Sequence, residues 1–417
     1  MQRISAAARE PVAVGPRNTF RSLRYHNYRS LWFGIVFGSL GQWMEQVALG
    51  WLVYELTGSP LQLSLVIGAR SLPLLLFGPF GGVAADRFDR RRILLASQAI
   101  VMILAFIVAM LTITGRVQVW QLALISFLGG WAWAFNIPAR QSLIPNVVPE
   151  GEVMNAVALQ ASGFQMTAIM GPSIAGLLIG VVDAGGVFLV NSALFVLVLF
   201  ATWQLRLPPK APDGEVLSVG RSMLEGFRFV RSDRAIFTAL LLALFPTVFG
   251  LPVVAMMPVF AREVLHVGAQ GLGYLNSALG VGAIIATLTI ASMGDLSRKG
   301  RLLIVACFSL GCFLVLFSQS RWLVLSLGAL LFVGGSRMSF MALTNTSIQL
   351  SVPDQYRGRV MSLLALDFGL TPLGTLLAGT IATYWGVQAA IGLFGIVCAT
   401  AGAVGWLRLR EFRDAVT

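Results

Sequence analysis

The sequence contains little charge and very few histidines and cysteines. Asp, Glu, Lys and Arg make up 12% of its 417 residues, against about 25% in a typical soluble domain. Its 2 histidines and 3 cysteines show no metal-ligand spacing, and the cysteines fall inside apolar runs. We therefore predict no metal site and no disulfide, and the low charge excludes a soluble globular fold.

Sequence patterns of enzymes and nucleotide-binding proteins are missing as well. The chain has no HExxH, no Ser-His-Asp set and no P-loop, so we expect neither catalysis nor use of ATP. The formal net charge of +12 does not indicate a nucleic-acid partner, because the basic residues are spread over many breaks between apolar runs. No cofactor is expected.

Hydrophobic residues are the most abundant class and make up 57% of the chain. About 20 consecutive apolar residues are needed to cross a bilayer, and only helices or closed barrels satisfy backbone hydrogen bonds there. The runs are too long and too uniformly apolar for barrel strands. The sequence predicts an all-α membrane protein with twelve transmembrane helices, at residues 31–55, 62–85, 92–114, 119–139, 155–182, 186–205, 236–261, 271–293, 302–319, 322–346, 360–384 and 387–407.

The distribution of Lys and Arg predicts the orientation, because basic residues remain on the cytoplasmic side. Of the 30 Lys and Arg residues, 25 fall on the side of the termini and 3 on the opposite side, so both termini are expected in the cytoplasm. We expect a multi-pass protein of the cell inner membrane. Its predicted parts are a cytoplasmic segment 1–28, a six-helix bundle 29–206, a cytoplasmic linker 207–235 with a short amphipathic helix, a second six-helix bundle 236–408 and a cytoplasmic tail 409–417.

A dense charge cluster, Gly82 to Arg92, separates the second and third predicted helices. Asp86 stands at the cytoplasmic end of the second, and the eleventh helix is predicted to begin on the same side of the membrane. A carboxylate docked on a helix N-terminus gains about 0.3–1 kcal/mol, so Asp86 would latch the two halves together. Arg87, Arg90 and Arg91 would hold carboxylates and helix C-termini, and Gly82 would allow close helix packing. A purely topogenic charge block is the alternative.

The two halves of the chain share weak sequence similarity in the same order. Met154-Asn-Ala-Val-Ala-Leu matches Met361-Ser-Leu-Leu-Ala-Leu, and Asp86–Arg90 matches Asp295–Lys299. Together with the charged hairpin, this pattern resembles the major facilitator superfamily over essentially the whole chain. The branch that includes enterobactin-type siderophore exporters and macrolide-efflux proteins is similar in four segments, Val47–Pro60, Pro138–Gln141, Ile169–Pro172 and Val352–Met361.

This resemblance implies two pseudo-symmetric bundles that rock around a central cavity lined by helices 1, 4, 7 and 10. It also implies that the hairpin motif closes the inner gate, although the family pattern usually has Gly where this chain has Asp89. On the fifth predicted helix, Gly171, Pro172 and Gly176 resemble a motif that is associated with exporters in the superfamily.

Charged residues inside predicted helices cost about 2.5–3.5 kcal/mol each and usually face a cavity or a partner. Four are present: Glu45, Arg70, Arg337 and Asp367. A carboxyl that can gain and lose a proton can couple transport to the proton gradient, so Glu45 is the first candidate for that role and Asp367 the second. Static ion pairs among the four are the alternative.

Polar and aromatic residues near these charges predict the substrate cavity. Gln42 and Gln46 share the first helix with Glu45, and Asn345 follows Arg337 on the tenth helix. On the fourth helix, Trp131 lies one turn before Phe135 and Asn136. This mixture suits a bulky, partly apolar ligand.

The sequence therefore favours a proton-coupled exporter of a bulky amphiphilic small molecule, such as a siderophore, drug or metabolite, working as a monomer by alternating access. An importer or a lysolipid flippase of the same fold is the alternative. A passive facilitator or channel is a different class, disfavoured by the apolar character of most helices.

Overall fold

The computed structural model describes residues 20–206, 227–231, 233–293, 299–352, 360 and 369–408. These residues form helices joined by short connections, so the predicted all-α class is confirmed. The longer helices are α1 (His26–Thr57), α2 (Pro60–Arg87), α3 (Arg90–Ile113), α4 (Val119–Val147), α5 (Val153–Trp203), α7 (Arg234–Phe245), α8 (Pro252–Glu263), α9 (Gly268–Ser292), α10 (Lys299–Gln319), α11 (Leu323–Ser351), α13 (Thr371–Trp385) and α14 (Val387–Arg408).

Two of the breaks between helices follow directly from local sequence. Helix α5 contains a kink at Asp183, whose φ of 57° is outside the helical region, and it is therefore two helices in one continuous element. Helices α7 and α8 are joined by a π-helical turn, Pro246–Gly250, in which the Leu251 N–H donates to the Pro246 carbonyl. Proline has no N–H to donate, so Pro246 and Pro252 interrupt the regular ladder on either side of this turn.

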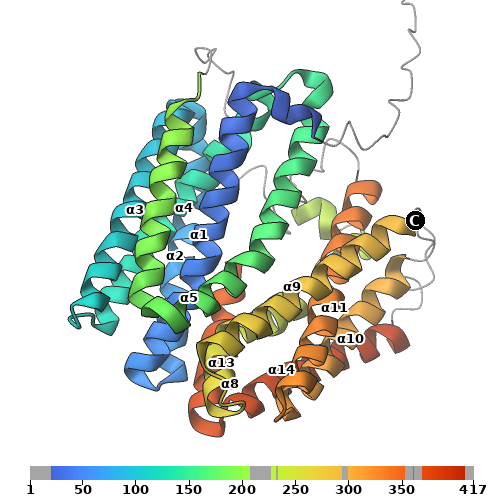
Figure 1. The fold of residues 1–417 in the computed structure, drawn as a ribbon. Helices are drawn as coiled ribbons and strands as arrows, with labels where there is room; N and C mark the ends of the chain where they lie inside the picture. Colours follow the sequence, from blue (N-terminus) through green and yellow to red (C-terminus); the bar gives the residue numbers. More distant parts are fainter. Residues whose placement is uncertain are drawn as a thin grey trace, which may run out of the picture.

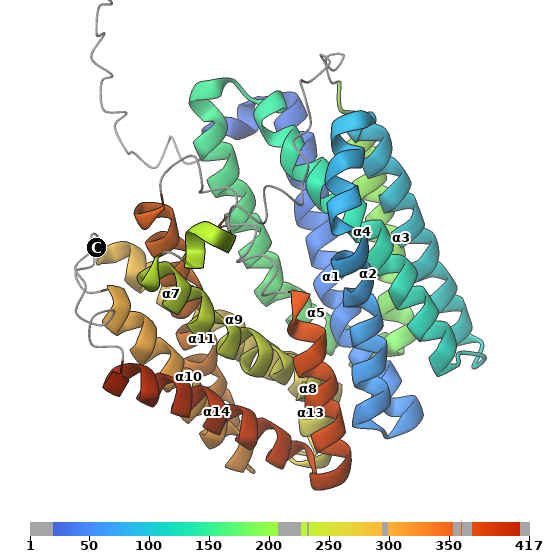
Figure 2. The same cartoon turned by 180° about the vertical axis from the view of Figure 1, so that it is seen from behind.

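Figures 1 and 2 show α1 to α5 standing together on one side of the molecule and α7 to α14 on the other. Within the first group α1 packs on α5 and α2 on α4, and within the second α9 packs on α11 and α10 on α14. Contacts between the groups join α5 to α9, α2 to α13 and α1 to α8. We call these groups the N-half and the C-half.

In the described part of the chain, 9 helices are long and apolar enough to cross a membrane. One of them, Glu150–Trp203, includes the kink at Asp183. Large apolar side chains also cover the outside of both halves, for example Leu65 at 51% and Leu288 at 65% exposure. Such a surface is unfavourable in water and fits the acyl chains of lipids.

The fourth predicted helix was too short. It was expected to end at residue 139, but α4 continues to Val147 with Pro138 and Pro145 inside it. Arg140, which was expected in an inner loop, therefore lies within a helix, and its guanidinium carbon is 5.7 Å from the Trp133 ring centroid. Neighbouring helices can satisfy the carbonyls that a proline frees, so proline does not mark the end of a membrane helix reliably.

Candidate functional site

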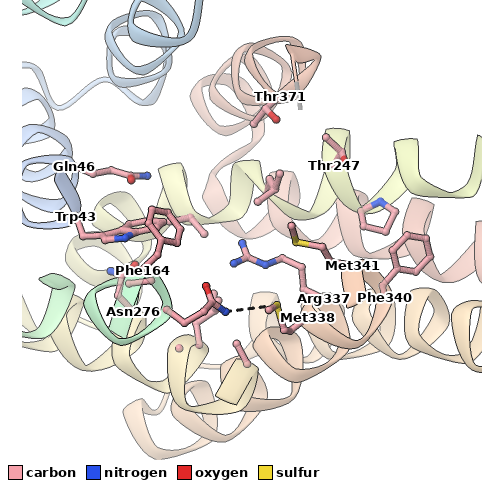
Figure 3. Close-up of a pocket in the computed structure, with 18 of the residues that line it drawn as sticks. Trp43, Gln46, Phe164, Thr247, Asn276, Arg337, Met338, Phe340, Met341 and Thr371 are labelled. Atoms are coloured by element: carbon pink, nitrogen blue, oxygen red, sulfur yellow. Dashed lines mark hydrogen bonds between the residues drawn. The ribbon is translucent and has the colours of Figure 1, made fainter. Parts of the chain in front are cut away.

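A cavity of about 610 Å³ lies between the N-half and the C-half. Residues of both halves line it, from α1, α2 and α5 on one side and from α7, α8, α9, α11 and α13 on the other. Figure 3 shows the lining side chains pointing toward a common space. A volume of this size is typical of sites for drug-sized ligands.

Most of the cavity wall is apolar. The rings of Trp43 and Phe164 lie 5.8 Å apart between centroids and form an aromatic wall on the N-half. Phe340, Met338 and Met341 contribute from α11 on the opposite side. Methionine adapts its shape to different ligands, and an aromatic wall binds flat or apolar groups without demanding one chemical structure.

The polar residues that line the cavity in the described part of the chain are amides and hydroxyls from both halves, and one arginine. Gln46, Gln165, Asn276 and Asn345 are the amides, and Thr247, Thr344, Thr371 and Thr375 are among the hydroxyls. Arg337 of α11 is the one charged side chain among the described lining residues. Figure 3 shows its guanidinium reaching into the cavity toward the side where Phe164 and Trp43 lie.

Three predicted cavity residues, Gln46, Arg337 and Asn345, line this space. Arg337 and Asn345 are eight residues apart on α11, close to two full turns, so they share a face. A polar residue that recurs at helical spacing in an apolar run is the signal that identified them.

Glu45 lies outside the cavity lining, contrary to its predicted place in the substrate path. One carboxylate oxygen pairs with Arg70 Nη1 at 3.0 Å, and the other accepts a hydrogen bond of 3.1 Å from Asn191 Nδ2. Consecutive residues on a helix point about 100° apart, so Gln46 faces the cavity while Glu45 faces α2 and α5. A static ion pair among the four charged residues was the alternative prediction, and the Glu45–Arg70 pair is of that kind. Asn191 was not predicted as a partner.

The remaining predicted cavity residues are placed elsewhere or not described. Asn136 is buried and donates a hydrogen bond of 2.9 Å to Ser97 Oγ on α3, and Trp131 is 37% exposed with its ring 5.1 Å from that of Phe135. Asn136 therefore faces α3, and neither it nor Trp131 is among the described residues that line the cavity. Gln42 lies one turn before Glu45 and is not among the described lining residues, and Asp367 lies outside the described residues.

In the hairpin after α2, the arginines bind helix carbonyls. Arg90 Nε donates to the Ala85 carbonyl at 3.1 Å and its Nη1 to the Ser142 carbonyl at 3.0 Å, and Arg91 donates to the Trp203 carbonyl. A cation near the last carbonyls of a helix is stabilised by the helix dipole. The hairpin thereby connects the ends of α2, α4 and α5 on one side of the N-half.

Asp89 gives the hairpin a well-defined turn, because its carboxylate accepts from the N–H groups of Arg91 and Arg92 at the start of α3. Asp89 is therefore the N-cap of α3, at the position where the family pattern usually has glycine. Arg87 is exposed. The side chain of Asp86 lies outside the described residues, and so do the residues before Val360 that Asp86 was expected to meet.

Gly82 does not provide the close helix packing that was expected of it. A Cβ on Gly82 would meet nothing within 4 Å. The preceding residue does so instead: a Cβ on Gly81 would lie 3.0 Å from the Ala134 carbonyl carbon on α4. The two adjacent glycines are not distinguishable in the sequence, and only the helix packing shows which one is required.

The three residues of the predicted exporter motif lie where α5 meets other helices. A Cβ on Gly171 would lie 2.5 Å from the Trp43 Cβ on α1, and a Cβ on Gly176 would lie 2.6 Å from the Gly273 Cα on α9. Pro172 lines the cavity. Gly176 therefore lies at a direct contact between the N-half and the C-half, where backbone approaches backbone.

A polar contact that the sequence did not reveal joins the halves at the end of α1. The Tyr54 hydroxyl donates to Glu263 at the end of α8, and the guanidinium carbon of Arg262 lies 5.9 Å from the Tyr54 ring centroid. These residues are 209 positions apart in the chain, so no local pattern connects them. Asn276 and Phe164 of the cavity were missed as well, although an isolated asparagine in an apolar run is a recognisable signal.

Comparison with known proteins agrees with this geometry. Residues 17–416 match the family model described as "Transmembrane secretion effector". Macrolide efflux protein A of Streptococcus pyogenes is 23% identical over 88% of this chain and 92% of its own length. The multidrug efflux pump Tap of Mycolicibacterium fortuitum is 27% identical over 91% and 95%, and the staphyloferrin A transporter of Staphylococcus aureus is 24% identical over 87% and 91%.

Solved structures show the same fold at lower sequence identity. A bacterial homolog of the human lysosomal transporter Spinster, in an inward-facing and unoccupied conformation, superposes with a TM-score of 0.75 at 15% identity, over 93% of this chain and 98% of that one. A D-xylose-proton symporter superposes with a TM-score of 0.70 at 15% identity, over 94% and 100%.

Proposed function

We propose that this chain, which belongs to the transmembrane secretion effector family of the major facilitator superfamily, exports a bulky amphiphilic small molecule by alternating access. That it is a multi-pass membrane transporter follows from the family and from its apolar helices. The observation that carries the proposal is the largely apolar cavity of about 610 Å³ that both halves line. Efflux proteins among the relatives favour export over import.

For the topology we propose twelve spans with both termini in the cytoplasm. The 9 apolar helices supply most of them, and the kinked one counts twice. Two further helices, α1 and α13, complete the twelve. Helix α1 contains the charged Glu45, and α13 is short because it begins at Thr371. The excess of Lys and Arg on the side of the termini supports this orientation in the cell inner membrane.

We propose that this structure is closed at the outer side. The close contacts between the halves lie near the end of α1 and the start of α2: Tyr54 meets Glu263, a Cβ on Gly50 would lie 3.2 Å from Pro258, and a Cβ on Gly379 would lie 2.8 Å from the Pro60 carbonyl oxygen. These contacts must separate when the cavity opens outward. On the inner side, the hairpin with Asp86 would replace them as the closing contact.

For energy coupling we propose the Glu45–Arg70 pair, with Asp367 as the second candidate. Protonation of Glu45 would remove its negative charge and release Arg70, so the contact between α1 and α2 would depend on the proton. Asn191 on the second part of α5 bonds the same carboxylate, so three helices respond to one proton. No bound cofactor is needed for this mechanism.

Efflux from intact cells tests the proposal. Cells that produce the chain are loaded with fluorescent amphiphiles of different charge, namely dansyl-leucine, dansyl-leucinamide and ethidium. Efflux of at least one probe should be faster than in cells with an empty vector, and a protonophore should abolish the difference. Equal efflux of every probe from both cell lines is the result that would refute the proposal.

The Tyr54–Glu263 contact gives a prediction for the outer gate. Replacing Glu263 by Gln should weaken a charge-assisted hydrogen bond and shift the population toward the outward-open state by up to about tenfold. The measurement is labelling of a single cysteine at Thr247, in a background without the three native cysteines, by a membrane-impermeant maleimide added outside. Tyr54→Phe should act in the same direction.

Tyr384→Phe is the matched control, because Tyr384 is 77% exposed near the end of α13 and the same hydroxyl is removed. Labelling in this variant should equal that of the parent. Unchanged labelling in both Glu263→Gln and Tyr54→Phe would show that the contact does not hold the gate.

A further inference from the structure

The charge of the cavity restricts the substrate class, if the chain is the exporter proposed above. Arg337 is the one charged side chain among the described lining residues, and no described acidic residue forms an ion pair with it. Arg70 on α2, by contrast, has a carboxylate partner, because its Nη1 lies 3.0 Å from Glu45 Oε1. A cation in a membrane helix that lacks a partner is costly, and such residues characteristically face the path of a substrate.

Some of the neutral polar groups of the cavity already have partners within the protein, whereas others are free. The amide groups of Asn276 and Asn345 donate to carbonyls of their own helices at 2.9 Å each, and the amide nitrogen of Gln165 lies 3.8 Å from the Met338 sulfur. By contrast, Trp43 Nε1 is buried without a hydrogen-bond partner among the described residues. The cavity therefore offers a ligand the five N–H donors of Arg337 and the indole N–H of Trp43, together with the Thr344 hydroxyl, which also has no partner among the described residues.

A ligand that suits this site brings acceptors and a negative charge. A guanidinium presents a planar fork of donors that matches a carboxylate in bidentate fashion, and it does so most strongly where water is excluded. An ammonium ligand would meet the positive charge of Arg337 and find no described carboxylate in the lining. The aromatic wall of Trp43 and Phe164 would then hold an apolar body attached to the acidic group.

We infer that the cavity binds amphiphiles that carry a carboxylate, with Arg337 as its anchor and the aromatic wall of Trp43 and Phe164 as the site of the apolar part. This inference deepens the proposed function by naming the substrate class. An ion pair between Arg337 and Asp367, which the sequence left open, makes the opposite prediction, since the arginine would then be neutralised.

Binding of two matched probes tests the inference. The purified full-length chain in lipid nanodiscs is titrated with dansyl-leucine, which carries a carboxylate, and with dansyl-leucinamide, which differs only by a neutral amide; empty nanodiscs correct for partitioning into lipid. The parent should bind the acid at least about tenfold more tightly than the amide. Arg337→Gln should remove this preference and leave amide binding within about twofold, and Arg337→Lys should retain part of it.

Arg321→Gln is the matched control, because it makes the same substitution at an exposed position before α11, outside the cavity. It should bind both probes as the parent does, and a thermal unfolding curve shows that each variant is folded. The inference is overturned if the parent binds acid and amide with equal affinity, or if Arg337→Gln still prefers the acid as strongly as the parent does. Export of neutral probes from cells would in that case leave the proposed function intact. Binding of neither probe, together with no efflux from cells, overturns both.

Discussion

Replacing Gly176 by Leu should abolish transport and leave both halves folded. Gly176 contacts Gly273 across the interface between the halves, where even a Cβ would lie 2.6 Å from a backbone carbon. A leucine side chain cannot fit there while the outer side is closed. The halves remain free to separate, because this contact is not part of either bundle's own packing. We therefore expect the cavity to be held open to the outside.

The measurement for Gly176→Leu combines efflux from cells with labelling of a cavity cysteine at Thr247 by an external maleimide. Efflux should fall to the level of the empty vector, and labelling should rise at least about tenfold, since accommodating the clash in the closed state would cost more than 1.4 kcal/mol. Gly328→Leu on α11 is the control, because a Cβ on Gly328 would meet nothing within 4 Å. Full transport in Gly176→Leu would exclude closure of the halves at this contact.

Replacing Glu45 by Gln should uncouple transport from the proton gradient. The variant retains the shape of the side chain and a hydrogen-bond acceptor, but it cannot bind and release a proton. Arg70 also loses the opposite charge that lies 3.0 Å away. Removing one partner of a fully buried ion pair costs about 3–5 kcal/mol; here both side chains keep 17% and 19% exposure, so the loss of stability should be smaller.

The double variant Glu45→Gln with Arg70→Gln separates coupling from stability. It removes the unpaired charge, so its thermal unfolding temperature should return toward that of the parent, whereas its response to a pH gradient should remain absent. Recovery of gradient-driven transport in the double variant would assign the proton to another group, for which Asp367 is the next candidate. Asp367→Asn alone should then show the uncoupled behaviour.

The positions of most described helices were predictable from the sequence. Hydrophobic length is a strong signal in a bilayer, because a helix that crosses it must be predominantly apolar. The kink at Asp183 falls in the gap between the fifth and sixth predicted helices, residues 183–185, where polar and small residues interrupt an otherwise apolar run. The end of α4 was missed, because an arginine and two prolines inside that helix imitate a loop.

The site was only partly predictable, and the reason is long-range packing. Arg337 and Gln46 were identified as cavity residues because a charged or polar group in an apolar run must face a cavity or a partner. The same rule placed Glu45 in the cavity, but its two partners, Arg70 and Asn191, are 25 and 146 positions away. Whether a buried charge faces a cavity or a partner depends on how its helix is rotated against the neighbouring helices. The Tyr54–Glu263 contact could not be read from the sequence for the same reason.

Transport into inverted membrane vesicles tests whether a proton gradient drives export through this chain. The probe is the dansyl or ethidium compound whose efflux from cells the chain increases. With the vesicle lumen made acidic, the probe should accumulate inside wild-type vesicles, and it should not do so in Glu45→Gln vesicles or when the gradient is collapsed by a protonophore. Accumulation that is the same with and without the gradient in wild-type vesicles would show that the proton gradient does not drive export.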